Sequence, residues 1–288
     1  MKHFSLLLTL LMICAACSQD ANTLIIQNKG SDTLVNLAQA WAEEYKNVNP
    51  KVALAVSGGG SGTGIAALIN GTVDIANSSR AIKQEEREQA KKNTGKDVNE
   101  FIVGMDALAV FVHPKNPLEG LTLEEAACIY GEGGTCTHWH HVRNTVVPGC
   151  KDNRIIRVSR QSNSGTYQYF REAILGKKRD LKLGSMDLSG SRESIDLVET
   201  TPCAIGYSGM GYLNPRIKAL CIQKDGNSPC IAPTVDSAID KSYPISRELY
   251  MYTSGSPSDA VKAYLDWTQS DEAHAITIKA GYVPAKKR

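Results

Sequence analysis

Apolar and polar positions in the first hundred residues alternate between two periods, and this pattern predicts repeated strand–loop–helix units. The predicted strands are the short apolar runs 24–26, 52–56 and 73–76. The predicted helices have apolar residues at helical spacing, and they cover 37–45, a helix that starts at 65–69, and 84–92. Such alternation is typical of α/β proteins, in which helices cover a mostly parallel sheet.

The same units continue after residue 106 and indicate a second lobe. The expected elements are a strand at 107–112, a helix at 123–130 with Thr122 as N-cap, a strand at 155–159, a helix at 167–175 and a strand at 204–207. A strand at 249–252 would cross back to the first lobe, and a final helix at 260–267 would complete it. We therefore predict that lobe I comprises 23–106 and 249–288, and lobe II 107–248.

The first residues read as an export signal. A basic residue, Lys2, precedes an apolar run at 4–13, which is too short to span a bilayer comfortably. Ala15 and Ala16 then stand directly before Cys17, as in the lipobox of bacterial lipoproteins. This resemblance predicts a signal peptide at 1–16, lipidation of Cys17 and an anchored linker at 17–22, in the periplasm or at the cell surface. Since Cys14 occupies a position where a lipobox usually has Leu, Val or Ile, an ordinary cleaved signal is the alternative.

Six further cysteines favour disulfides in an oxidising compartment. They are Cys128, Cys136, Cys150, Cys203, Cys221 and Cys230. Cys221 and Cys230 flank a turn-like run, so their pairing is the most plausible, and the other connectivities stay open. The cluster Cys136, His138, His140, His141 and Cys150 offers an alternative as metal ligands. Its spacing fits no standard zinc pattern, and we predict no metal site.

Composition and charge restrict the function classes. The apolar fraction of 42% and the charged fraction of 22% are those of a globular protein, which argues against disorder. A net charge of +2, with no basic stripe among aromatic residues, argues against a nucleic-acid partner. Nucleotide-binding glycine motifs and the G-x-S-x-G elbow of serine hydrolases are missing from the sequence. A small ligand is therefore expected.

Three loops between a strand and a helix are rich in Gly, Ser and Thr. Unpaired N–H groups and the positive end of the helix dipole favour an anion there. The loops are 29–33, 57–64 and 160–166, and the last of them carries Arg160, whose fork of donors suits a tetrahedral oxyanion. Because ligands of α/β sheets bind outside the carboxyl ends of strands, these loops are expected to face one cleft between the lobes.

Taken in order, these loops resemble the PstS-like phosphate-binding proteins of ABC transporters, within the periplasmic binding protein superfamily. The matching motifs are residues 30–34, 60–65, 74–80, 116–117 with 121–122, 159–166, 204–207 and 243–247. The resemblance implies the type II two-lobed fold, with two mixed, mostly parallel sheets and a ligand cleft between them. It also implies a monomer that binds inorganic phosphate and delivers it to a membrane permease, without a cofactor or a catalytic residue.

The resemblance carries the phosphate ligands over by position. The expected ligands are Thr33, the backbone of Leu34, Ser61, Ser79, Arg80, Arg160, Ser164, Gly165 and Thr166. Some relatives have an Asp where this chain has Ser79, and that carboxylate accepts a hydrogen bond from protonated phosphate. Asp32 or Asp74 would have to replace it here, although a turn or cap role is preferred for Asp74.

Other functions compete with this interpretation. The same loops would suit another oxyanion, such as sulfate, tungstate or arsenate, or a sensory surface lipoprotein. A phosphate-ester hydrolase would need a base beside Ser61 or Ser164, and the sequence offers no candidate. The segment 131–150, rich in Cys and His, is not typical of the family and is expected to be a surface insertion.

Overall fold

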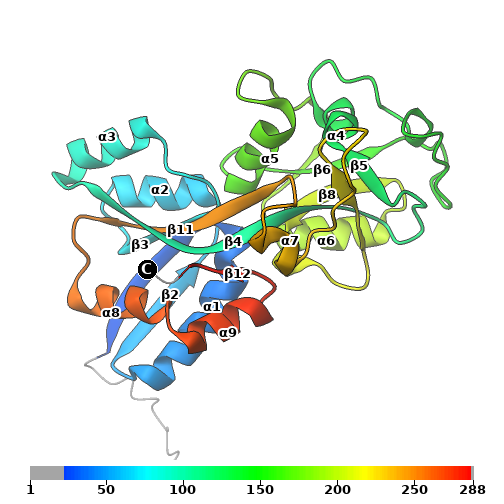
Figure 1. Cartoon of the computed structure of the whole chain (residues 1–288). Helices are drawn as coiled ribbons and strands as arrows, with labels where there is room; N and C mark the ends of the chain where they lie inside the picture. Colours follow the sequence, from blue (N-terminus) through cyan, green and yellow to red (C-terminus); the bar gives the residue numbers. More distant parts are fainter. Residues whose placement is uncertain (1–22, 287–288) are drawn as a thin grey trace, which may run out of the picture.

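The computed structural model describes residues 23–286, which form two lobes joined by two long strands (Figure 1). The predictions for 1–16, Cys17 and the whole linker 17–22 lie outside these residues. The joining strands are β4 (Val98–Val112) and β11 (Ser246–Ser254). Both run from one lobe into the other, so each lobe is built from segments that are distant in the sequence.

Lobe I contains three of the predicted strand–helix units. Its elements are β1 (Leu24–Gly30), α1 (Asp32–Val48), β2 (Val52–Ser57), α2 (Ser61–Ile69), β3 (Ile75–Ser78), α3 (Gln84–Thr94), α8 (Asp259–Trp267), α9 (Asp271–Lys279) and β12 (Val283–Pro284). The helix predicted at 260–267 is α8, but it is not the last one. The chain continues through α9, whose N-cap Ser270 accepts a hydrogen bond from the Ala273 N–H.

Lobe II carries the second set of units and several short elements. They are β5 (Gly120–Thr122), α4 (Leu123–Tyr130), η1 (Trp139–His141), β6 (Ile156–Arg160), α5 (Gly165–Leu175), β7 (Met186–Leu188), α6 (Ser191–Thr200), β8 (Ala204–Gly209), η2 (Met210–Tyr212), β9 (Lys218–Ala219), β10 (Cys221–Gln223) and α7 (Val235–Ile239). Helix α4 has the predicted bounds, and Thr122 caps it in a box with Glu125.

The α/β class and the two-lobed architecture are confirmed, but the sheet is continuous. Its strand order is β2-β1-β3-β11-β4-β8-β6-β7. The pairs of β1 with β2 and β3, and of β6 with β7 and β8, are parallel, whereas β4 and β11 pair antiparallel with their neighbours. The family resemblance implied two separate sheets, and β4, predicted only from 107, was not expected to extend into both lobes. Its first half includes Glu100, Gly104 and Asp106, which interrupt the apolar pattern.

The core is divided between the lobes. In lobe I, the aromatic residues Trp41 and Tyr45 of α1 are buried. In lobe II, Phe170 stacks on Tyr207 with ring centroids 3.8 Å apart. Most of the segment 131–150, which was expected to be a surface insertion, is exposed or half-buried, but Trp139 within it is fully buried in the lobe II core.

The six cysteines form three disulfides, all in lobe II. The predicted pair Cys221–Cys230 is present, and the pairs left open are Cys128–Cys136 and Cys150–Cys203. The last one joins residues 53 positions apart, which no local pattern reveals. Over residues 23–286, no helix combines the length and the apolar character needed to cross a membrane.

Candidate functional site

The N-termini of three helices meet between the lobes. Helices α1 and α2 come from lobe I, and α5 comes from lobe II. The hydroxyl oxygens of Thr33 and Thr166, on α1 and α5, lie 2.8 Å apart and share a hydrogen bond. Next to them, the Gly62 N–H on α2 donates to the Asn163 carbonyl at 2.9 Å. The structure thus brings the three predicted anion loops together, as their positions after strands β1, β2 and β6 require.

Gly165 is packed against two other predicted ligands. A Cβ atom placed on it would lie 2.3 Å from Ser61 Oγ and 2.7 Å from Ser79 Oγ. These two serines belong to lobe I, and the Ser61 Oγ accepts a hydrogen bond from the Ser79 N–H at 3.0 Å. Only glycine permits this approach, so the first turn of α5 reaches the lobe I loops with its backbone. Ser164 precedes it as the N-cap and accepts from the Tyr167 N–H.

Arg160, at the end of β6, lies across the boundary between the lobes. Its Nη2 donates to Asp32 Oδ2 at 3.1 Å, and Asp32 is the first residue of α1. Three more hydrogen bonds join the guanidinium to Leu188 O, Ser189 O and Ser191 Oγ within lobe II. Burial lowers the pKa of Arg160, and the Asp32 carboxylate opposes this shift. The side chain remains a cation whose position is determined by lobe II.

A second buried arginine, Arg247, contacts more of the predicted ligands than Arg160 does. Its Nη2 donates to Thr166 Oγ1 at 3.0 Å and Thr33 Oγ1 at 3.3 Å, and its Nη1 donates to Ser79 O at 3.2 Å. Sequence analysis included Arg247 in a family motif but assigned it no ligand role. The signal available was its position at the start of the strand predicted to return to lobe I.

Asp106 neutralises Arg247 in the interior, and sequence analysis missed it as well. The Nε and Nη2 of Arg247 both donate to Asp106 Oδ2, at 3.0 and 2.7 Å, and Oδ1 accepts the Met210 N–H. Burial raises the pKa of Asp106, although Arg247 acts in the opposite direction. The formal charges of Arg160, Arg247, Asp32 and Asp106 cancel, so an incoming anion meets mainly hydrogen-bond donors.

Two predicted ligands lie differently from the expectation. The guanidinium of Arg80 pairs with Glu86 at 2.7 and 2.8 Å and also donates to Ala81 O. The side chain of Leu34 is fully buried in the core, and its N–H donates to Ser31 O within the first turn. Both predictions came from the family resemblance, which matches positions in the sequence and not the directions of side chains.

The two carboxylates considered as phosphate acceptors have different surroundings. Asp74 is exposed and accepts the Gln27 N–H at 2.7 Å, which is the turn or cap role preferred for it. Asp32 lies beside Thr33, holds Arg160 and also accepts the Gly59 N–H at 2.9 Å. Of the two, Asp32 is therefore the one placed among the predicted ligands.

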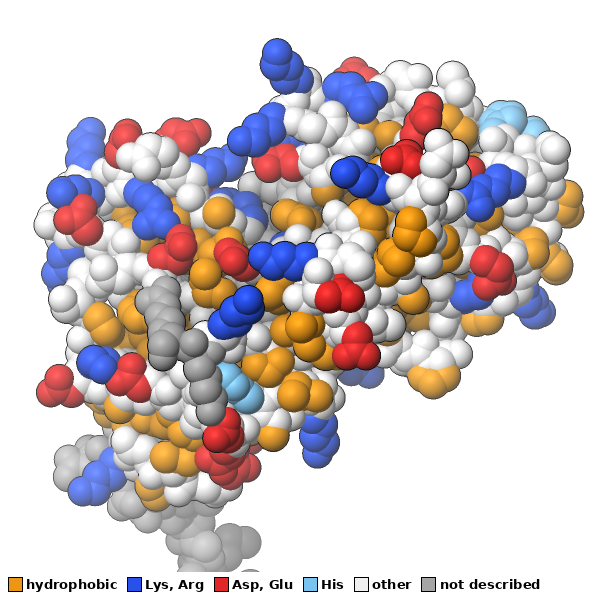
Figure 2. Space-filling view, in the orientation of Figure 1, with side chains coloured by type: hydrophobic (Ala, Val, Ile, Leu, Met, Phe, Trp, Pro, Cys, Tyr) orange, Lys and Arg blue, Asp and Glu red, His pale blue; other side chains and the backbone are white. Residues whose placement is uncertain are grey.

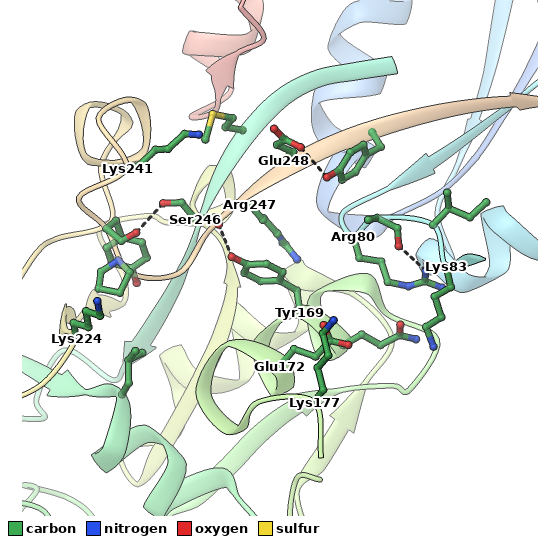
Figure 3. Close-up of a pocket in the computed structure, with 18 of the residues that line it drawn as sticks. Arg80, Lys83, Tyr169, Glu172, Lys177, Lys224, Lys241, Ser246, Arg247 and Glu248 are labelled. Carbon is green, nitrogen blue, oxygen red and sulfur yellow. Dashed lines mark hydrogen bonds between the residues drawn. The ribbon is translucent and has the colours of Figure 1, made fainter. Parts of the chain in front are cut away.

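A groove of about 1080 Å³ opens between the lobes next to these residues (Figure 3). Tyr169 lies in its wall, donates to Ser246 O and stands 5.6 Å from the guanidinium carbon of Arg247. Lys and Arg side chains surround the hollow between the lobes (Figure 2). The groove is lined by six cationic side chains, Arg80, Lys83, Lys177, Lys224, Lys241 and Arg247, against three acidic ones, Glu85, Glu172 and Glu248. An excess of positive charge of this kind raises the local concentration of anions.

These contacts define a class of protein: a two-lobed binding protein in which hydroxyl, backbone and guanidinium groups of both lobes meet between the lobes. The family model described as PBP superfamily domain matches residues 17–272. The chain belongs to this superfamily and, within it, to the family of PstS phosphate-binding proteins.

Individual relatives agree with that assignment. The phosphate-binding protein PstS of Pseudomonas aeruginosa is 32% identical over 90% of this chain and 82% of its own length. PstS of Bacillus subtilis is 30% identical over 88% of this chain and 79% of its own. A structure from Clostridium perfringens, described as a phosphate ABC transporter substrate-binding protein with bound phosphate, has 26% identity and a TM-score of 0.80, and covers 91% of this chain and all of its own.

Proposed function

We propose that this protein binds inorganic phosphate between its lobes and presents it to the permease of an ABC importer. The observation that carries the proposal is the meeting of Thr33, Ser61, Ser79, Gly165 and Thr166 in one place, with two buried arginines beside them. The donors outnumber the acceptors, as a tetrahedral dianion requires. Relatives of this chain at 30–32% identity are described as phosphate-binding proteins.

Binding is proposed to proceed without covalent chemistry. Ser61 Oγ contacts Ser79, and Ser164 Oγ accepts the N–H of Tyr167. Neither hydroxyl has an imidazole or carboxylate partner among its described hydrogen bonds, and a nucleophile would need such a base. This supports a binding role over that of a phosphate-ester hydrolase.

Lobe closure is the proposed response to the ligand. The predicted lobe boundaries at 106/107 and 248/249 fall inside β4 and β11. A hinge in these two strands would move lobe I, with Thr33 and Ser61, relative to lobe II, with Arg160 and Thr166. Phosphate contacts both sets and therefore favours the closed arrangement. A permease that recognises the closed form would then receive only loaded protein.

The setting of this function also remains a proposal. We infer an exported monomer that is held at a membrane through lipid on Cys17, with the lobes on the extracytoplasmic side. The three disulfides of lobe II support an oxidising compartment. Replacing Cys17 by Ser and following the protein between membrane and soluble fractions tests the anchor.

Isothermal titration of the ligand-stripped protein tests the binding. We expect one phosphate per chain, little heat from sulfate and none from a phosphate monoester. Arg160→Ala should weaken phosphate binding by about 100-fold or more, because truncating one member of a buried charge pair costs about 2 to 5 kcal/mol. The matched control is Arg216→Ala, since Arg216 is 58% exposed and pairs with Glu199 on the surface. Equal affinity in both variants, or a preference for sulfate, would contradict the proposal.

A further inference from the structure

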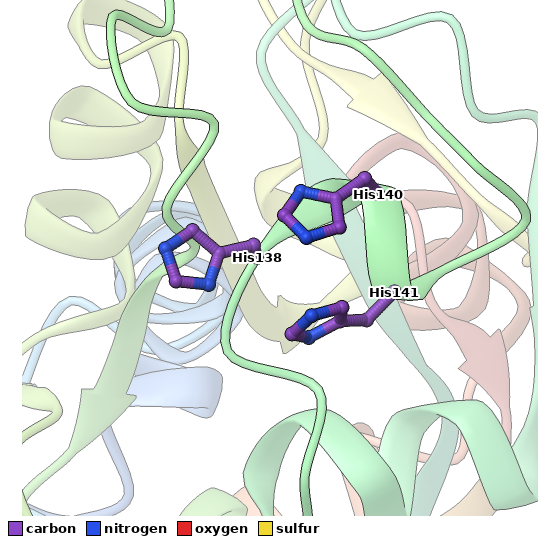
Figure 4. Close-up of side chains that lie close together, drawn as sticks. All are labelled: His138, His140 and His141. Atoms are coloured by element: carbon purple, nitrogen blue, oxygen red, sulfur yellow. The ribbon is translucent and has the colours of Figure 1, made fainter.

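Three histidines form a cluster on lobe II, in the segment between α4 and β6 that the phosphate site does not use (Figure 4). They are His138, His140 and His141, and one nitrogen from each lies within 4.8 Å of the others. The rings of His140 and His141 are 4.3 Å apart at their centroids. Imidazole nitrogen is a preferred ligand of Zn²⁺, Cu²⁺ and Ni²⁺, so a group of three imidazoles at this distance is a candidate metal site.

The backbone that carries the cluster is held in place on several sides. Trp139, between the histidines, is fully buried and donates its indole N–H to Cys203 O at 3.0 Å. Its own backbone N–H donates to Asn153 O, and His138 forms a β-bridge with Arg154. The disulfide Cys128–Cys136 ties the chain two residues before His138. A ligand set on a fixed backbone loses less conformational entropy when it binds an ion.

The disulfides remove two cysteines from the candidate ligands of this segment. Cys136 and Cys150 were the other candidate ligands in this segment, and both are engaged in disulfides. A disulfide sulfur is not a thiolate and does not ligate a metal. The ligand set is therefore purely imidazole, with His138, His140 and His141 in one short turn, η1 and the residue before it.

We propose that His138, His140 and His141 form a surface site for a divalent transition-metal ion, with Zn²⁺ as the ion that fits best. Tetrahedral Zn²⁺ with Zn–N bonds of about 2.0 to 2.1 Å places its nitrogens about 3.3 Å apart. The nitrogens here must approach by at most about 1.5 Å from the separation of 4.8 Å. Rotations of the exposed side chains of His140 and His141 suffice for this, and water completes the coordination.

The hydrogen bonds around the rings fit ligation. His138 Nδ1 lies 2.9 Å from Thr137 Oγ1, and a hydrogen bond donated to that hydroxyl leaves Nε2 of His138 as the lone pair for the ion. Such bonds orient metal-binding histidines in general. His141 Nδ1 accepts the Thr137 N–H in a long hydrogen bond of 3.3 Å. If His141 bound the ion through Nδ1, this hydrogen bond would be replaced by the metal–nitrogen bond.

Zinc titration of the full chain without a histidine tag tests the proposal. The protein is first treated with EDTA and dialysed, and then titrated with ZnCl₂ by calorimetry. We expect one Zn²⁺ per chain, and at least about tenfold weaker binding in the His140→Ala/His141→Ala variant, because losing even an outer-shell partner costs about 10- to 100-fold. The matched control is His113→Ala, which removes a histidine outside the cluster and should leave zinc affinity unchanged.

A spectroscopic measurement and a stability check complete the test. Cu²⁺ bound to the wild type should give an electron paramagnetic resonance signal with nitrogen hyperfine splitting, and the double variant should lose it. Thermal unfolding of the metal-free proteins shows whether the double variant is folded, and single His140→Ala replaces it otherwise. The proposal is overturned if zinc affinity is the same in the double variant and the wild type, or if the wild type binds no zinc.

Discussion

Two Arg–Asp pairs lie at the centre of the part of the chain that the structure describes, and they differ in what they connect. Arg247 and Asp106 are register partners on β11 and β4, and their side chains are 2% and 0% exposed. Arg160 and Asp32 come from different lobes, and the side chain of Asp32 is 17% exposed. The first pair belongs to the strands that join the lobes, whereas the second exists only while the lobes touch.

This difference assigns the pairs different roles. Arg247 has its counter-ion on the neighbouring joining strand and donates both to Thr33 of lobe I and to Thr166 of lobe II. Arg160 must give up Asp32 when the lobes separate, although Ser189 O, Leu188 O and Ser191 Oγ continue to hold it. An anion between the lobes can take over a donor of Arg160 more easily than one of Arg247. The following substitutions separate the two roles.

The largest expected effect is on stability at the pair in the joining strands. Asp106→Ala should lower the free energy of unfolding by about 3 to 5 kcal/mol, because it leaves the Arg247 cation buried without a counter-ion. Asp32→Ala is the matched control and should cost clearly less, since Arg160 keeps its lobe II partners. Urea unfolding followed by circular dichroism measures both. In Asp106→Leu/Arg247→Met, most of the stability should return while phosphate affinity stays low. Equal losses in the two single variants would remove the distinction.

Replacing Gly165 should hold the lobes apart. It should disturb the Arg160–Asp32 pair, which joins the lobes, and leave the Arg247–Asp106 pair in place. In Gly165→Ala the new methyl group would overlap Ser61 Oγ and Ser79 Oγ, so the lobes cannot close fully. We expect phosphate affinity to fall by about 30-fold, equivalent to about 2 kcal/mol, with little change in the stability of either lobe. Gly226→Ala is the control, because no atom lies within 4 Å of the position that its methyl group would take. Calorimetry that finds unchanged phosphate affinity in Gly165→Ala would show that closure does not matter.

Anion selectivity should depend on the carboxylate of the interlobe pair. Asp32 is the carboxylate beside the predicted ligands, and sulfate has no proton to donate to it near neutral pH. Asp32→Asn should therefore raise sulfate affinity by about tenfold, or about 1.4 kcal/mol, while phosphate affinity changes less. Competition of sulfate against phosphate measures the ratio of the two affinities. Asp74→Asn serves as the control, because the Asp74 carboxylate accepts the Gln27 N–H. An unchanged ratio in Asp32→Asn would place the discrimination elsewhere.

The smallest effect is expected at a half-exposed ion pair, Arg143–Glu125 on lobe II. Burial alone would raise the pKa of Glu125, but the hydrogen bonds from Arg143 and the Thr122 N–H outweigh it and lower the pKa. The ion pair therefore stabilises the fold above about pH 4.5, the pKa of Glu125 in the unfolded chain. This stabilisation is lost as the pH falls through the lower pKa that Glu125 has in the folded protein.

Replacing that carboxyl group measures the contribution. Glu125→Gln should cost about 0.5 kcal/mol at pH 7 and nothing once the carboxyl is protonated in both states. Thermal unfolding between pH 7 and pH 3 compares it with Glu132→Gln, a glutamate on the same lobe. If the difference between Glu125→Gln and the wild type does not shrink toward acid pH, the pair is not the source of the stabilisation.

Local patterns were sufficient for most elements and for part of the site. The apolar runs and helix caps of lobe I determine the three units, and Thr122 marks the start of α4 to the residue. The glycine-rich loops indicated an anion site, and the family resemblance pointed to Thr33, Ser61, Ser79, Gly165 and Thr166, which the structure brings together. That they bind phosphate remains a prediction for the titration.

Other features depend on residues that are far apart in the sequence. Asp106 and Arg247 are 141 positions apart, and neither belongs to a glycine-rich loop of the kind that predicts an anion site. Asp106 also lies in the polar half of β4, which the apolar pattern placed outside the strand. Arg80 was predicted as a ligand from the family resemblance, and in the structure its side chain pairs with Glu86. A position in the chain does not determine side-chain direction.

The α/β class, the two lobes, the loops that meet between them and the Cys221–Cys230 pair could be predicted from the sequence, because they depend on local periodicity, turn residues and helix ends. Three features became visible only in the folded chain: β4 and β11 unite the lobes in one sheet, two Arg–Asp pairs lie at the centre, and three histidines of one short turn face one another. These features require long-range strand register and the burial of charge, and neither leaves a local signal.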